Sequence, residues 1–395
     1  MRVRARGAAG DAGDDAEIDK GSSFLPSLPS CRHAVLLAAL LLLLLFVLQA
    51  VAQQPQPSPL SLRATTSAAA AVAQPLLPPR FLRYSPSALE AEWTANIKEW
   101  QQGICSRLGG APGSARAAVQ RLLDALDQQH YEGDDLPVGA GARALDALEA
   151  DGLLSVMEYS HAGSVVRVRM MPLVGMLRDP RVSCPPHAYG TGPFTELRGV
   201  DMYKEWQIQS RMFLFLDPRA AALHSGSRAV LLDLGASTWN HQAGSRWVSQ
   251  RLEQQGVRFE HVWAWEASRV EPRDFFKGAD ASQLATLHFY NWPVSAEPGA
   301  PDNPWTLLAA SAAPSDHVVV KLDIDAEHID NPLARQVLED PVLLARVDDF
   351  FFEMHFSNPD MDWLWKNDGY TSTVADTYAL FSQLRRKGVR ANPWP

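Results

Sequence analysis

The stretch Ala229–Ser237, which reads AVLLDLGAS, decides the fold. It is an apolar run of β-strand length that ends in Asp-Leu-Gly and continues into small residues. A strand that is apolar along its whole length is typical of a parallel sheet covered on both faces. The small residues let the backbone approach a ligand, and a following helix would offer free N–H groups. The stretch therefore predicts the first strand and first turn of a Rossmann-like sheet.

The same rhythm of strands and helices continues to the C-terminus. Further apolar strands are predicted at 259–268, 286–295, 317–327 and 348–356, with a short sixth strand at Val389-Arg390. Helices are predicted at Ser245–Gln255, Asn303–Ala312, Pro332–Ala345 and Thr373–Lys387, with Pro332 in the first turn of its helix. Strands that alternate with helices indicate right-handed βαβ units. We therefore predict an α/β fold with a doubly wound, mostly parallel sheet over residues 196–395.

A helical accessory region with one β-hairpin is predicted at residues 81–195. Ser87 is placed to cap a helix with apolar residues spaced near four apart, and two more helices are predicted at Ser114–Gln129 and Ala142–Leu148. Residues 153–173 alternate apolar and polar side chains around His161-Ala162-Gly163, which indicates the hairpin. No residue pattern in this region indicates catalysis.

The N-terminus has three parts, none of which predicts a globular core. Residues 1–33 are mixed in charge and predicted to be disordered, residues 34–52 are an apolar run, and residues 53–80 form a stalk rich in Pro, Ser and Ala. The apolar run has the length of a transmembrane helix. It predicts either a signal anchor with a lumenal C-terminal domain or a signal peptide cleaved after Ala52, which would give a secreted protein. Both of these place the protein in the secretory pathway, and the remaining alternative is a buried core helix.

Charge and cysteine content limit the partners of the chain. The net charge is −9, and no stripe of Lys and Arg follows residue 60, so we do not expect nucleic-acid binding. Cys105 and Cys184 both follow the apolar run. They would pair in an oxidising compartment, and the alternative is two free buried thiols.

Polar residues at the ends of the predicted strands are the candidates for ligand binding, because ligands of such sheets lie at the carboxyl ends of the strands. These residues are Asp233, Gly235, Glu266, Asn291, Asp323, Asp325, Glu353 and His355. Glu266 ends the second strand about 30 residues after Asp233-Leu234-Gly235. A carboxylate there can accept hydrogen bonds from two ribose hydroxyls, which favours a nucleoside cofactor. The alternative is that these acidic residues only cap strand ends.

Four of these stretches, VLLDLGAS, VWAWEAS, VVVKLDIDAEHID and FFFEMHF, resemble the FkbM-type S-adenosylmethionine-dependent methyltransferases. The resemblance covers about Ala229 to Phe356 and implies a methyltransferase-type Rossmann-like fold with S-adenosylmethionine as cofactor. By position it implies that Asp233 and Gly235 line the methionine side of the cofactor and that Glu266 holds the ribose. The further candidates for cofactor binding are Ala236 and Ser237 of the same turn and Asn291 at the third strand. The implied reaction is O-methyl transfer to a small-molecule, glycan or lipid-linked acceptor of the secretory pathway.

Asp323-Ile324-Asp325 also permits a different function. An Asp-x-Asp sequence after an apolar strand can bind a divalent metal that holds a sugar nucleotide, as in a metal-dependent glycosyltransferase. In the methyltransferase interpretation, Asp323, Asp325 and His355 are the catalytic candidates, either as a general base or around a divalent metal. Otherwise these three residues would only hold loops in place. The third alternative for the function is a methyltransferase-like binding module without catalysis.

The loop after the fifth predicted strand contains three aromatic residues, Trp363, Trp365 and Tyr370. They would form an acceptor wall or anchor the loop by packing.

Overall fold

The computed structural model describes residues 78–109, 117–119, 121, 122, 124, 140–178, 217–240, 244–361 and 369–394, which all belong to one compact unit, Ala73–Pro395. The predicted tail, the apolar run 34–52 and the stalk up to residue 77 lie outside the described residues. Among the helices that the structure describes, none has the length and apolar character needed to cross a membrane.

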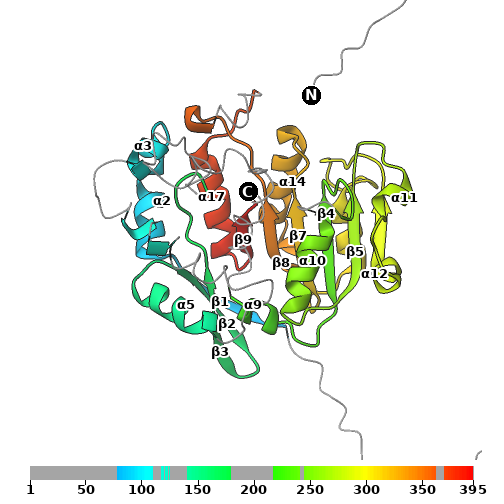
Figure 1. Ribbon diagram of the computed structural model, residues 1–395, viewed down its shortest axis with the longest axis horizontal. Helices are drawn as coiled ribbons and strands as arrows, with labels where there is room; N and C mark the ends of the chain where they lie inside the picture. Colours follow the sequence, from blue (N-terminus) through cyan, green and yellow to red (C-terminus); the bar gives the residue numbers. More distant parts are fainter. Residues whose placement is uncertain are drawn as a thin grey trace, which may run out of the picture. The chain divides into compact units, whose positions relative to one another are not determined.

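A six-stranded, fully parallel sheet forms the C-terminal part of the unit (Figure 1). Its strands are β4 (Ala229–Leu234), β5 (Phe259–Trp265), β6 (Leu287–Tyr290), β7 (His317–Leu322), β8 (Val347–Phe352) and β9 (Arg390–Pro393). They lie in the order β6-β5-β4-β7-β8-β9, which is the Rossmann order with its reversal between β4 and β7. Every residue of β4 and β7 is buried, as expected for central parallel strands. The prediction of a mostly parallel Rossmann-like α/β sheet is confirmed.

Helices cover both faces of this sheet, so it is doubly wound. Val318 and Val320 of β7 belong to one hydrophobic core, and Val319 between them belongs to the other. The first core includes residues of α13 (Pro304–Ser311), α14 (Glu327–Glu339) and α17 (Val374–Arg386), whereas the second includes residues of α10 (Ser245–Gln254). Shorter helical segments fill the connections: α9 (Arg219–Ala222), α11 (Pro272–Phe275), α12 (Ala281–Thr286), α15 (Pro341–Leu344) and η4 (Pro359–Met361).

The helix predicted at Pro332–Ala345 starts earlier than the sequence suggested. It begins at Glu327 and ends at Glu339, so Pro332 lies inside α14 and not in its first turn; Pro341 instead begins the separate helix α15. The reason for the early start is the Asp330 carboxylate, which accepts the Ala326 N–H at 3.0 Å and the Ile324 N–H at 3.3 Å. These bonds satisfy backbone donors at and before the helix start, which favours helix initiation there.

The accessory region contains α2 (Ala88–Trp100), α3 (Ile104–Gly109) and α5 (Ala140–Ala150), and the described residues between 117 and 124 are also helical. Ser87 caps α2 by accepting the Glu90 N–H, as predicted. The predicted hairpin is confirmed as β2 (Ser155–His161) and β3 (Ser164–Met170). The sequence missed a third strand, β1 (Arg80–Ser85), which pairs with β2 at the boundary assigned to the stalk.

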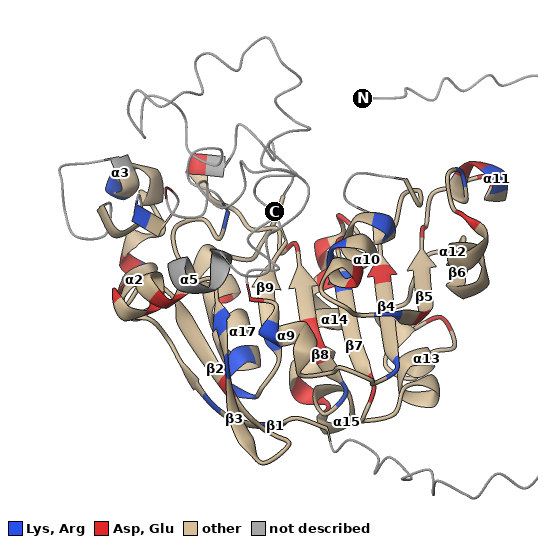
Figure 2. Cartoon of the chain, turned by 60° about the horizontal axis from the view of Figure 1, so that its bottom comes forward, with Lys and Arg blue, Asp and Glu red and all other residues tan. Residues whose placement is uncertain are grey.

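The accessory region and the parallel sheet share one hydrophobic core. Leu89 and Trp93 of α2 belong to the same buried cluster as Val320 and Phe352 of the sheet. In both views the accessory elements lie at the β9 end of the sheet, opposite β5 and α12 (Figures 1 and 2).

A buried ion pair also links the accessory region to the sheet domain. Arg385 of α17 donates to Glu90 of α2 at 3.1 Å, with both side chains almost fully buried. Arg385 also donates to the Met171 carbonyl at 2.9 Å, and the Tyr378 hydroxyl donates to the Gly175 carbonyl at 3.0 Å. These hydrogen bonds therefore hold the backbone at Met171 and Gly175, which follow β3, against α17.

Candidate functional site

A cavity of about 230 Å³ opens at the carboxyl ends of β4, β5 and β7, where the strand order of the sheet reverses. Ligands bind at this position in open parallel sheets. The residues that line the cavity are Gly235, Ser237, Trp265, Glu266, Ala267, Ser268, Trp292, Val294, Asp323, Ile324 and Asp325. Five of the predicted site residues, Gly235, Ser237, Glu266, Asp323 and Asp325, are thus brought together.

The turn after β4 passes very close to the end of β7. Gly235 has a φ of +89°, and a Cβ atom built on it would lie 1.8 Å from the carbonyl oxygen of Asp323. The Asp323 N–H in turn donates to the Leu234 carbonyl at 2.9 Å. Only glycine fits this conformation and this approach. Ser237, two residues later, also has a left-handed backbone, with a φ of +54°.

Glu266 connects the turn after β4 to the loop after β5. Its two carboxylate oxygens accept the Ser237 N–H at 2.9 Å and the Ser268 N–H at 2.7 Å. A carboxylate has about four acceptor positions, so these two bonds leave room for further donors from a ligand. Glu266 is thus held in a fixed orientation at the cavity wall.

Asn291 lies behind this wall and does not line the cavity. Its amide nitrogen donates to the carbonyls of Glu266 at 2.8 Å and Ser268 at 2.6 Å, and its oxygen accepts the Val270 N–H at 3.1 Å. These bonds hold the loop after β5 in place. The structure therefore places Asn291 where it supports Glu266 through the backbone.

A group of charges centred on the buried Lys321 adjoins the cavity through Asp323. The Lys321 ammonium contacts Asp233 at 3.0 Å, Asp323 at 3.1 Å and the Gly235 carbonyl at 3.1 Å. Burial favours the neutral amine, but the charges of Asp233 and Asp323 outweigh it and raise the pKa of Lys321, which is therefore a permanent cation. Ala236 is also buried, and its N–H donates to the Trp265 carbonyl. Asp233 and Ala236 are thus buried next to residues of the cavity and do not line it themselves.

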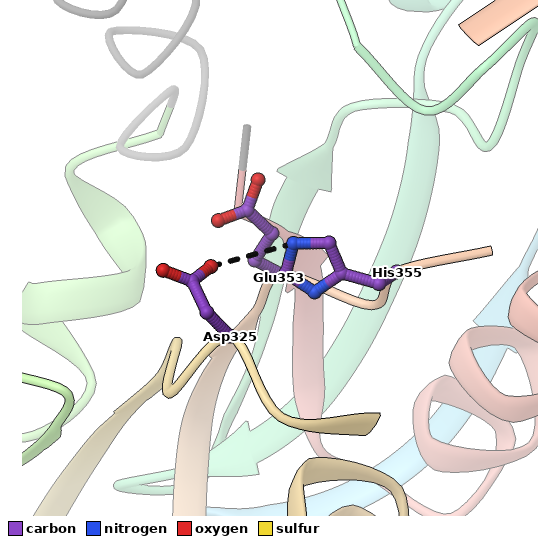
Figure 3. A group of neighbouring side chains, drawn as sticks. All are labelled: Asp325, Glu353 and His355. Atoms are coloured by element: carbon purple, nitrogen blue, oxygen red, sulfur yellow. Dashed lines mark ion pairs between the residues drawn. The ribbon is translucent and has the colours of Figure 1, made fainter. Parts of the chain in front are cut away.

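Asp325, Glu353 and His355 form a second cluster at one side of the cavity (Figure 3). Each offers one potential metal-ligating atom, and these atoms all lie within 4.8 Å of one another. The His355 Nε2 atom lies 3.4 Å from an oxygen of Asp325. Asp325 also has a left-handed backbone, with a φ of +64°.

Two neighbours of this cluster come from elsewhere in the chain. Arg178 forms an ion pair with Glu353 from the accessory region, in which the sequence showed no functional residue. No local signal could have identified Arg178, because its partner Glu353 lies 175 positions away in the sequence. The Tyr370 ring lies 4.8 Å from the His355 ring, so one of the three aromatic candidates is at the site. Trp363 and Trp365 lie outside the described residues.

The sequence analysis missed the aromatic lining of the cavity. Trp265 stacks on Tyr290 at 4.7 Å, and Tyr290 contacts Trp292 edge-on at 5.1 Å. Trp292 is 46% exposed although it is a large apolar side chain. An exposed tryptophan in a cavity wall is a suitable surface for a flat or apolar ligand group. The third strand was predicted to run through Trp292, over 286–295, whereas β6 ends at Tyr290 and leaves Trp292 in the loop at the cavity.

Cys105 is disulfide-bonded, and its partner lies outside the described residues.

The whole chain matches no protein-family model, no curated protein and no solved structure. The geometry of the site therefore carries the functional argument.

Proposed function

We propose that this protein is an S-adenosylmethionine-dependent methyltransferase. The observation that carries the proposal is the position of Glu266, which ends the strand next to β4 and accepts the Ser237 N–H of the Gly235 turn at 2.9 Å. A fixed carboxylate at this point of a Rossmann-like sheet is suited to bind the two hydroxyls of a ribose. The resemblance to FkbM-type sequences identifies the same residue for the same task.

The charges and surfaces of the cavity fit this cofactor. Asp323 and Asp325 give the wall a negative charge beside Glu266, which favours a ligand with a positive sulfonium and ammonium group. Trp265 and Trp292 provide aromatic surface for a base. The cofactor supplies a methyl group activated by the sulfonium. Asp323, Asp325 and His355 are the groups that would orient the acceptor and receive its proton.

The direct test is the binding of S-adenosylhomocysteine to the full chain, measured by isothermal titration calorimetry. We expect the wild type to bind and Glu266→Ala to bind about 100-fold more weakly or worse, since two hydrogen bonds to a charged group contribute about 1.5–3 kcal/mol each. Glu271→Ala is the matched control, because its side chain is 59% exposed and lies near the same loop. Unchanged affinity in folded Glu266→Ala would overturn the cofactor assignment.

The acceptor that we propose is a hydroxyl of a small molecule, glycan or lipid-linked molecule in the secretory pathway. This part rests on the apolar run 34–52 and on the resemblance. Methyl transfer from labelled S-adenosylmethionine to glycan and glycolipid fractions would test it. Binding of the cofactor without transfer to any of them would favour a binding module that lacks catalysis.

The glycosyltransferase alternative has weaker support from the geometry. The two carboxylates of Asp323-Ile324-Asp325 face different partners, because Asp323 contacts Lys321 at 3.1 Å and Asp325 contacts His355 at 3.4 Å. An Asp-x-Asp metal site would need both carboxylates near one ion with its diphosphate. Stabilisation by a sugar nucleotide with Mn²⁺, and not by S-adenosylhomocysteine, would reverse this preference.

A further inference from the structure

The cluster of Asp325, Glu353 and His355 combines donors from two neighbouring strand ends. Asp325 follows β7, whereas Glu353 and His355 follow β8 with one residue between them. Figure 3 shows the three side chains directed toward a common point, and their potential ligand atoms lie within 4.8 Å of one another. One imidazole and two carboxylates at such distances can surround a single ion.

A third carboxylate, that of Asp323, lies beside the cluster. In the part of the chain that the structure describes, Arg178 forms an ion pair with Glu353, and Lys321 forms one with Asp323. A bound divalent cation would offset the charges of carboxylates that lie this close to one another.

We propose that Asp325, Glu353 and His355 form a binding site for a first-row divalent ion such as Mn²⁺ or Zn²⁺. The imidazole favours these ions over Mg²⁺ and Ca²⁺, which prefer oxygen ligands alone. The ion pair with Arg178 involves one oxygen of Glu353, and the carboxylate offers one potential ligand atom to the cluster.

The cavity determines what the ion would do. Asp325 lines the cavity and its side chain is 76% exposed, so the ion would lie at the cavity wall. Three protein ligands leave at least one coordination position open. This position suits an oxygen of a small molecule in the cavity, such as a hydroxyl or a carboxylate. The site does not depend on the methyltransferase proposal, because Glu266 and its ribose position take no part in it.

The experiment is a titration of the metal-stripped full chain with MnCl₂ or ZnCl₂, followed by calorimetry and, for Mn²⁺, by electron paramagnetic resonance. We expect one equivalent to bind and both His355→Gln and Asp325→Asn to weaken the binding at least 10-fold. Asparagine tolerates the left-handed backbone at position 325, so the second variant retains the loop conformation. Exposed His328 and Asp302 provide the controls, because His328→Gln and Asp302→Asn should bind the ion like the wild type.

The outcomes are distinct. Absence of binding at 1 mM metal, or undiminished binding by folded Asp325→Asn, would overturn the proposal. Binding of Mg²⁺ as tight as that of Mn²⁺ and insensitive to His355→Gln would also overturn it, because the imidazole would not be a ligand. Glu266→Ala should bind the metal normally, so failure of the cofactor assignment and failure of the metal site are separate results.

Discussion

Gly235 allows the sharpest test of how the site is built. Replacement by alanine would place a Cβ atom 1.8 Å from the Asp323 carbonyl oxygen, where ordinary contact begins at 3.4 Å. The ends of β4 and β7 would have to separate by about 1.6 Å to relieve this overlap. Both the Asp323 N–H bond to Leu234 and the Lys321 bond to the Gly235 carbonyl would then be lost.

The expected loss of stability follows from these contacts. Each buried hydrogen bond that is broken costs about 1–3 kcal/mol. The left-handed backbone adds about 1–2 kcal/mol for a residue with a Cβ atom, and the lower entropy of unfolded alanine offsets about 0.4–1 kcal/mol. Together these contributions predict that Gly235→Ala lowers the free energy of unfolding by about 3–7 kcal/mol.

The measurement is denaturant unfolding of the wild type, Gly235→Ala and the matched variant Gly256→Ala. Gly256 has a φ of +92°, close to the +89° of Gly235, but a Cβ atom there would meet nothing within 4 Å. It therefore isolates the cost of the backbone conformation, which we expect to be at most about 1.5 kcal/mol. Losses that agree within about 1 kcal/mol for the two variants would show that the close approach of β4 and β7 is not what requires glycine.

The other predictions concern buried charges. Lys321→Met leaves Asp233 buried without its cation and should lower the free energy of unfolding by about 3–5 kcal/mol, whereas Lys277→Met at an exposed position should change it little. Equal unfolding midpoints for the two variants would contradict this. Burial, and then the nearby charge of His317, holds the pKa of His224 well below 6.5 in the folded protein. The unfolded chain therefore takes up a proton first, and the wild type should lose up to about 1.4 kcal/mol per pH unit below about pH 6.5. His224→Gln should show a shallower decline in unfolding experiments between pH 7 and 5, and an equally steep decline would assign the acid sensitivity elsewhere.

The sequence predicts the parallel sheet well because its strands are buried along their length. In β7 even Lys321 lies inside, yet the apolar residues around it still indicate a strand. The exact start of α14 was not predictable, since it depends on how the Asp330 side chain bonds to the backbone of the preceding loop. The strand β1 was missed because its sequence, RFLRYS, does not alternate apolar and polar side chains. Phe81 and Leu82 are adjacent, and the pairing with β2 shifts register between Phe81 and Arg83.

The candidate site was predictable in part for a related reason. Gly235, Glu266 and Asp325 follow the carboxyl ends of neighbouring strands, and a parallel sheet brings such ends together. Asp233 is buried and Asn291 bonds to the backbone of the loop after β5, so neither residue lines the cavity. The position of a residue at a strand end does not reveal these differences. The contact of Arg178 with Glu353 joins residues 175 positions apart and depends on the complete tertiary structure.

The core shared by the accessory region and the sheet limits how a ligand can be captured. Enzymes of two lobes often close around their ligand by rotation about a hinge, and the surfaces between the lobes must then be able to separate. Here Leu89 and Trp93 are packed into the same apolar interior as Val320 and Phe352, and a rotation would open that interior to water. We therefore expect any closure over the cavity to involve the loops around it and not a rotation of the accessory region, and we expect mutations that change the rate of ligand entry to lie in those loops.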